Sequence, residues 1–193
     1  VPDVHTSWGM ALNEADAKHL VFGRDVAFTF GPYAGVYSAR FHPATDVLMV
    51  VSSLLLALGY AALLILLARG TNAYWLPLLL GVFVAYSPVN LGPPNRDAFM
   101  FSFCFLVMLV AFRMSAVPIA RRHLRLTAAE SLFLASLAML GLLPLIKGSL
   151  LPVVVLTAAV SCCLFVFVRV WAIAAGALLL PCVAAVLFWR AAG

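Results

Sequence analysis

The chain has 193 residues, of which 65% are hydrophobic and only 10% are charged, with a formal net charge of +5. Its mean hydropathy is +1.11. A soluble domain carries about a quarter charged residues, so lipid must cover much of this apolar surface. The basic residues form no stripe interleaved with aromatic residues, and we therefore expect no nucleic-acid partner.

The first 46 residues form a polar segment that precedes the apolar part of the chain. Its residues 7–20 have the pattern of an amphipathic helix, with Trp8, Leu12 and Ala15 on one face. The segment also holds aromatic residues, which are typical of the lipid–water interface: Trp8, Phe28, Phe30, Tyr33 and Tyr37. We therefore expect residues 1–46 to form an extracytoplasmic segment whose interfacial helix lies on the membrane.

Residues 47–68 hold no charge over 22 positions, which is about the length that a helix needs to cross the bilayer core. Similar apolar runs continue almost to the end of the chain. The sequence therefore predicts an all-α membrane protein with about six transmembrane helices in a single domain, 47–193. The predicted spans are 47–68, 73–90, 98–112, 128–146, 149–168 and 170–189, and residues 114–120 can extend the third.

The distribution of Lys and Arg predicts the orientation of the spans. The densest basic loop, Arg121-Arg122-His123-Leu124-Arg125, is typical of a cytoplasmic loop. With that loop inside, residues 1–46 lie outside, and we expect an integral protein of a bacterial inner membrane. The chain begins at Val1, and a further span would deliver residues 1–46 to the outside. It stops at Gly193, just after a hydrophobic run, so we expect truncation at both ends.

Ionisable groups near a bilayer are costly and often serve function. The predicted topology gathers several of them at the extracytoplasmic surface: Asp3 with His5, Arg24 with Asp25, Asn95-Arg96-Asp97, and Lys147. A general base at Asp3 would act on a hydroxyl, although composition favours a solvated loop acid near a helix start. The pair of Arg24 and Asp25 is either a turn among aromatic anchors or a contact for a phosphate.

Asp97 has two explanations. It is either an acid in the first turn of a helix that Asn95 caps, where the helix dipole favours negative charge, or a functional carboxylate. Lys147 interrupts an apolar run between Pro144 and Gly148. Its ammonium can reach the membrane surface by snorkelling, or it can bind an anionic headgroup or phosphate.

Four segments together carry a family resemblance: Pro2-Asp3-Val4-His5, Gly23-Arg24-Asp25 with Phe30-Gly31-Pro32-Tyr33, Arg96-Asp97, and Gly141-Leu142-Leu143-Pro144-Leu145-Ile146-Lys147-Gly148. In order and spacing they resemble the motifs of the GT-C superfamily of integral-membrane glycosyltransferases. That superfamily contains protein O-mannosyltransferases and the aminoarabinose transferases of lipid A. The turn at residues 28–33 is similar to that of a bacterial branch of the superfamily.

The resemblance implies an enzyme that moves a sugar from a polyprenyl-phosphate donor to an acceptor at the outer face of the membrane, among membrane lipids. It implies Asp3 as catalytic base and Asp97 as a second catalytic residue that orients a cation or contacts the sugar. It also implies substrate binding by five residues: His5, Arg24, Asp25, Arg96 and Lys147. Among these, the cations would stabilise the charge of the leaving phosphate.

Val4 stands where the superfamily commonly has a second acid. We therefore predict no metal ligands, and a divalent cation would lack one of its two carboxylates. Two other classes stay open. A transporter or flippase would have charges near the bilayer midplane and paired broken helices. A non-catalytic scaffold subunit is compatible with the missing second acid.

Overall fold

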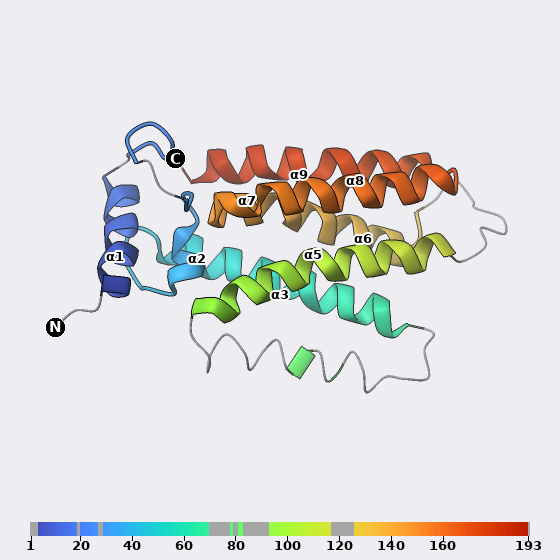
Figure 1. The fold of residues 1–193 in the computed structure, drawn as a ribbon, viewed down its shortest axis with the longest axis horizontal. Coiled ribbons are helices and arrows are strands. Elements are labelled where there is room, and N and C mark those ends of the chain that lie inside the picture. Colours follow the sequence, from blue (N-terminus) through green and yellow to red (C-terminus); the bar gives the residue numbers. More distant parts are fainter. Residues whose placement is uncertain are drawn as a thin grey trace.

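The computed structural model describes residues 4–18, 20–26, 29–69, 78, 81–82, 93–116 and 126–192, with the side chains of 4–7 and 93–95 left out. The named elements in this part of the chain are all helical (Figure 1). They are α1 (Val4–Ala17), α2 (Ala34–Ser38), α3 (Asp46–Ala68), α5 (Pro93–Ala116), α6 (Ala128–Met139), η1 (Leu140–Leu142), α7 (Leu143–Ile146), η2 (Gly148–Leu150), α8 (Leu151–Phe167) and α9 (Trp171–Ala191).

Five stretches of the described chain are long and apolar enough to cross a membrane. They are Asp46–Ala68, Arg96–Ala116, Ala128–Ile146, Gly148–Phe167 and Trp171–Ala191. These match five of the predicted spans within a few residues, and the third extends to Ala116. The remaining predicted span, 73–90, lies almost wholly outside the described residues. The chain is therefore an all-α integral membrane protein.

The spanning helices run side by side along the long axis of the molecule, and α1 lies across one end of them (Figure 1). In the bundle α9 packs on α8, α6 and η1, while α5 packs on α8 and α3, and α3 packs on α6. Large side chains such as Phe103, Phe133 and Phe165 fill the interior and are fully buried. Apolar residues on the outer faces, among them Leu58, Phe105 and Val155, are more than half exposed and suit contact with lipid tails.

Side-chain hydrogen bonds stabilise the start of α6 and the end of α3. Helix α6 begins after Thr127, whose side chain accepts a hydrogen bond from the Glu130 backbone N–H. The Glu130 carboxylate in turn accepts from the Thr127 backbone, which completes a capping box. At the end of the bundle where α6 begins and α3 ends, Arg113 donates to the carbonyls of Leu67 and Arg69. These bonds satisfy carbonyl groups that the end of α3 leaves without helical partners.

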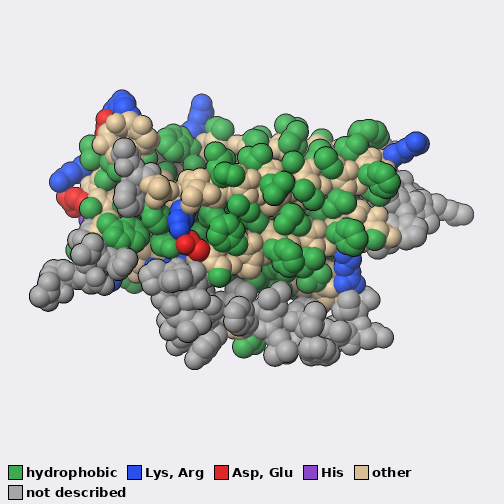
Figure 2. Space-filling model, in the orientation of Figure 1, with side chains coloured by type: hydrophobic (Ala, Val, Ile, Leu, Met, Phe, Trp, Pro, Cys, Tyr) green, Lys and Arg blue, Asp and Glu red, His purple; other side chains and the backbone are tan. Residues whose placement is uncertain are grey.

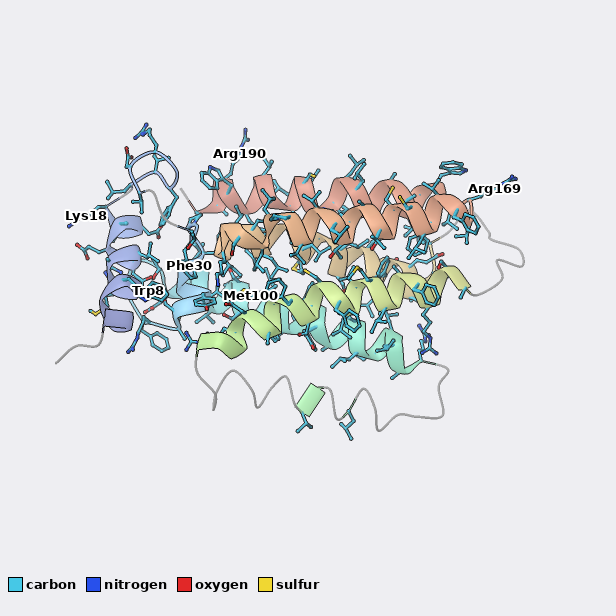
Figure 3. The ribbon with its side chains drawn as sticks, in the orientation of Figure 1. Trp8, Lys18, Phe30, Met100, Arg169 and Arg190 are labelled. Carbon is cyan, nitrogen blue, oxygen red and sulfur yellow. The ribbon has the colours of Figure 1, made fainter. Side chains whose placement is uncertain are left out.

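Charged groups gather at the two ends of the bundle, and apolar side chains cover its middle (Figure 2). Lys18 and Arg190 lie at the end covered by α1, and Arg169 lies at the opposite end (Figure 3). Arg96 and Lys147 also lie at the α1 end, because one begins a span and the other separates two spans that meet there. The charged residues thus lie at the ends of the spans, which agrees with the positions of the basic residues between apolar runs in the sequence.

Two helix boundaries differ from expectation. The first helix begins at Val4 and ends at Ala17 rather than covering 7–20. Helix α5 begins at Pro93, so Asn95 is not its N-cap and Asp97 lies beyond its first turn. The interpretation of Asp97 as a first-turn acid is therefore wrong. Proline favours the first positions of a helix, where its missing N–H costs no hydrogen bond, and this explains the earlier start.

Candidate functional site

Two segments far apart in sequence pair at the α1 end of the bundle. Segment 29–33 runs antiparallel to segment 145–148, where α7 ends and η2 begins. Three backbone N–H groups donate across the junction: Gly148 to the Thr29 carbonyl at 2.7 Å, Gly31 to Ile146 at 3.3 Å, and Tyr33 to Leu145 at 3.1 Å. The junction fixes the loop of the polar segment against the transmembrane bundle. We call it the 29–33/145–148 junction.

Lys147 lies between α7 and η2 and interrupts the helical backbone there. Its backbone is extended, with φ −142° and ψ 110°, between helical residues on both sides. The backbone of Lys147 pairs with that of Phe30. Its side chain is 19% exposed, so the ammonium is largely removed from water. A cation in such a position requires a partner.

That partner is Asp97, near the start of α5. The Lys147 Nζ donates to both carboxylate oxygens of Asp97, at 2.7 Å and 2.8 Å. The Asp97 side chain is 31% exposed, so the ion pair is only partly screened by solvent. Asp97 thus holds the ammonium in one place. An ammonium has three N–H donors, so it can bond to a further acceptor besides this carboxylate.

Aromatic rings cover the same ammonium. The Lys147 Nζ lies 4.9 Å from the ring centroid of Tyr37 and 5.5 Å from that of Phe30. Both distances are within the range of a cation–π attraction. Phe30 packs on Tyr37 at 4.8 Å between centroids and stacks on Trp8 of α1 at 5.0 Å. The result is a fixed cation with one apolar, aromatic side.

Tyr37 connects the three charged groups of this site. Its backbone carbonyl accepts a hydrogen bond from the Arg96 guanidinium. Burial and, after it, the negative charge of Asp97 raise the pKa of Tyr37, whose hydroxyl interacts with Asp97 and Lys147 through side-chain hydrogen bonds. Tyr37 therefore stays a neutral phenol. The sequence pattern predicts only an interfacial aromatic at Tyr37, and nothing in its local sequence marks it as part of a site.

The Arg24–Asp25 pair forms a separate small turn. Arg24 donates to Asp25 at 2.9 Å and 2.8 Å, and the Val21 N–H donates to the same carboxylate at 3.0 Å. These bonds, the one from Arg24 first, lower the pKa of Asp25 to about 2. Arg24 is exposed, and neither side chain has a described contact with Lys147 or Asp97. The structure thus assigns this pair to its own turn.

The other candidates near the N-terminus are not placed. Asp3 lies outside the described residues, and His5 belongs to α1 with its side chain outside the description. No group of three or more His, Cys, Asp or Glu side chains that could hold a metal ion occurs among the described residues.

An apolar cavity of about 410 Å³ lies beside Arg96, where α2, α3 and α5 meet. Its described lining residues are Val36, Ala39, Ser53, Leu56, Arg96, Phe99 and Met100. Arg96 is the only charged side chain among them. The cavity is within the size range of a site for one small ligand or part of a larger one.

No protein-family model, curated protein or solved structure matches this chain.

Proposed function

We propose that this chain is a membrane glycosyltransferase that moves a sugar from a polyprenyl-phosphate donor to an acceptor at the membrane surface bearing Lys147. One observation carries the proposal. Three of the four segments that resemble the GT-C motifs meet at one place, although they are separated by roughly 50 residues or more in sequence. They are 30–33, Arg96-Asp97 and the Lys147 turn.

The chemistry of the proposed reaction fits a fixed cation. When the bond from sugar to carrier breaks, negative charge grows on the lipid phosphate, and a cation already in position stabilises that charge without reorganisation. Asp97 and the rings of Tyr37 and Phe30 restrict Lys147 in this way. On substrate binding, the ammonium would donate to the phosphate in place of the Tyr37 hydroxyl. Asp97 then acts by orienting a cation, one of the two roles that the resemblance implies.

The proposed base is Asp3, which would accept the proton of the acceptor hydroxyl as that oxygen attacks the anomeric carbon. His5 and the Arg24–Asp25 pair would contact the substrates from the same polar segment. The junction supports this arrangement because it ties the segment to the turn that carries Lys147. Bringing two substrates together at such a place contributes a large part of the rate gain in transfer reactions.

Orientation and location are part of the proposal. The α1 end would face the extracytoplasmic side of a bacterial inner membrane, where lipid-linked sugars are used. The sequence between α5 and α6 supports this orientation, because it holds the densest basic cluster of the chain, at 121–125, and short cytoplasmic loops attract such clusters.

A non-catalytic scaffold is the second candidate. The mutual neutralisation of Lys147 and Asp97 favours it, because such a pair can serve only to join α5 to the turn before α8. Variants of the pair distinguish the two candidates, because only a transferase loses sugar transfer when Lys147 is replaced.

The test measures sugar transfer in membranes that contain the complete protein, with a radiolabelled polyprenyl-phosphate sugar as donor. Asp3→Asn and Lys147→Met are each expected to abolish transfer, while Lys18→Met, an exposed lysine at the same end, retains it. Undiminished transfer by Asp3→Asn removes Asp3 from the mechanism. Absence of transfer by the wild-type protein with every donor tried favours the scaffold.

A further inference from the structure

The cavity beside Arg96 differs from the Lys147 site in its charge. Lys147 has a carboxylate partner, whereas Arg96 donates to a backbone carbonyl and has no acidic partner among the described residues. Asp97 follows Arg96 directly in the chain, but its two oxygens bond to Lys147. Arg96 therefore brings to the wall of an apolar cavity a positive charge that no described carboxylate pairs with.

The depth of the lining residues relates the cavity to the bilayer. Arg96 begins a span, at the level expected for lipid headgroups. Met100 lies four residues further along α5, which is roughly 6 Å deeper at 1.5 Å per residue. On α3, which begins at Asp46, Ser53 and Leu56 lie roughly 10 Å and 15 Å below the helix start. The cavity thus has a cation at headgroup depth and apolar walls below it.

We infer that an anionic phospholipid of the surrounding bilayer binds here, with its phosphate on the Arg96 guanidinium and one acyl chain in the cavity between α3 and α5. A guanidinium bonds a phosphate through two parallel N–H groups, which fixes the headgroup. The acyl chain of the lipid lies against Leu56, Phe99 and Met100. The Ser53 hydroxyl is a second polar group of the lining, suited to a glycerol or ester oxygen.

Charge complementarity selects an anionic headgroup over a zwitterionic one. The described lining residues include no carboxylate that could receive the ammonium of a zwitterionic lipid. The volume of about 410 Å³ suits part of one chain rather than two whole chains. This inference does not depend on the proposed sugar transfer, since a bound phospholipid can equally stabilise a scaffold.

The experiment places the purified full chain in nanodiscs of phosphatidylcholine alone, of phosphatidylcholine with phosphatidylglycerol, or of phosphatidylcholine with polyprenyl phosphate. Thermal unfolding is recorded, and retained lipid is counted by native mass spectrometry. Phosphatidylglycerol is expected to raise the Tm and to stay bound, because a ligand of the folded state stabilises it. Arg96→Gln is expected to weaken this binding about tenfold, the loss expected for a hydrogen bond to a charged group.

Two further variants keep the test decisive. Ser53→Trp leaves the charge in place but fills the cavity, and it is expected to abolish the shift caused by phosphatidylglycerol. Arg190→Gln removes the same charge at the same end of the bundle, from α9 on the side away from α5, and keeps the shift (Figure 3).

Three outcomes overturn the inference. One is a phosphatidylglycerol shift that is undiminished in Arg96→Gln or that survives in Ser53→Trp. Another is an equal loss in Arg190→Gln, which indicates general attraction to an anionic surface. The third is stabilisation by polyprenyl phosphate but not by phosphatidylglycerol, which assigns the cavity to the proposed donor.

Discussion

A Cβ atom on Gly31 would lie 2.3 Å from the carbonyl oxygen of Leu145. The two backbones of the 29–33/145–148 junction approach so closely that no side chain fits between them. This contact fixes the loop that carries Phe30 against the turn that carries Lys147. The aromatic cover of the ammonium therefore depends on a glycine.

Replacing Gly31 by alanine is expected to destabilise the protein by about 1–3 kcal/mol, the usual cost of overpacking a close contact. Unfolding in detergent would measure the loss. Gly148→Ala is the matched control, because a Cβ there meets the Thr29 carbonyl oxygen at an ordinary 3.4 Å. Equal losses in the two variants would contradict the close-contact explanation.

The Lys147–Asp97 pair is expected to behave as a coupled unit. Lys147→Met or Asp97→Asn leaves one charge partly buried without its partner, and each is expected to cost about 1–3 kcal/mol, between the values for exposed and fully buried pairs. The double variant is expected to cost less than the sum. A double-mutant cycle from unfolding measurements checks this. Additive losses would mean that the two side chains do not interact.

The Asp25 turn makes a prediction about pH. Its pKa of about 2 lies below the ordinary 3.8, chiefly because Arg24 bonds to the carboxylate, so the turn is intact above pH 3.8. Protonation loosens it as the pH falls from about 3.8 through about 2. Carbon NMR of labelled Asp25 should give a midpoint near 2, and Arg24→Gln should raise it toward 3.8. A midpoint that Lys147→Met also raises would contradict the independence of the turn from the Lys147 site.

The crossing of η1 and α9 gives a prediction about the bundle itself. A Cβ on Gly141 would lie 2.3 Å from the Pro181 carbonyl oxygen and 2.7 Å from the Ala185 nitrogen, both rigid backbone atoms. Gly141→Ala is therefore expected to lower the Tm. Gly176→Ala is the control, because its Cβ meets the flexible end of the Leu134 side chain, which can move. A larger loss in Gly176→Ala would contradict this view of the crossing.

The spans could be predicted because helix length and apolarity are set by the bilayer and are visible in one sequence. The run 47–68 became α3 with a shift of one residue at its start. The start of α5 was missed because Asn95 resembles a cap, while Pro93 and Pro94 suit the first helical positions equally well.

The candidate site could be predicted only in part. Asp97 and Lys147 stood out because charges are rare in this chain, and the structure puts them in contact. Their aromatic cover could not be foreseen, since Phe30 and Tyr37 have the pattern of interfacial anchors. The junction left no signal either, because backbone hydrogen bonds carry no side-chain code.

The proposed function depends most on whether Lys147 acts on a substrate or only pairs with Asp97. Exchanging the two, in the variant Lys147→Asp/Asp97→Lys, keeps an ion pair between the same backbone positions but moves the cation to α5. Sugar transfer from a radiolabelled polyprenyl-phosphate donor, measured in membranes beside the unfolding temperature, decides between the two roles. Our account predicts that the exchange restores much of the stability lost in the single variants and leaves transfer abolished. Recovery of transfer together with stability would contradict it, because a pair that works in either order has only a structural role.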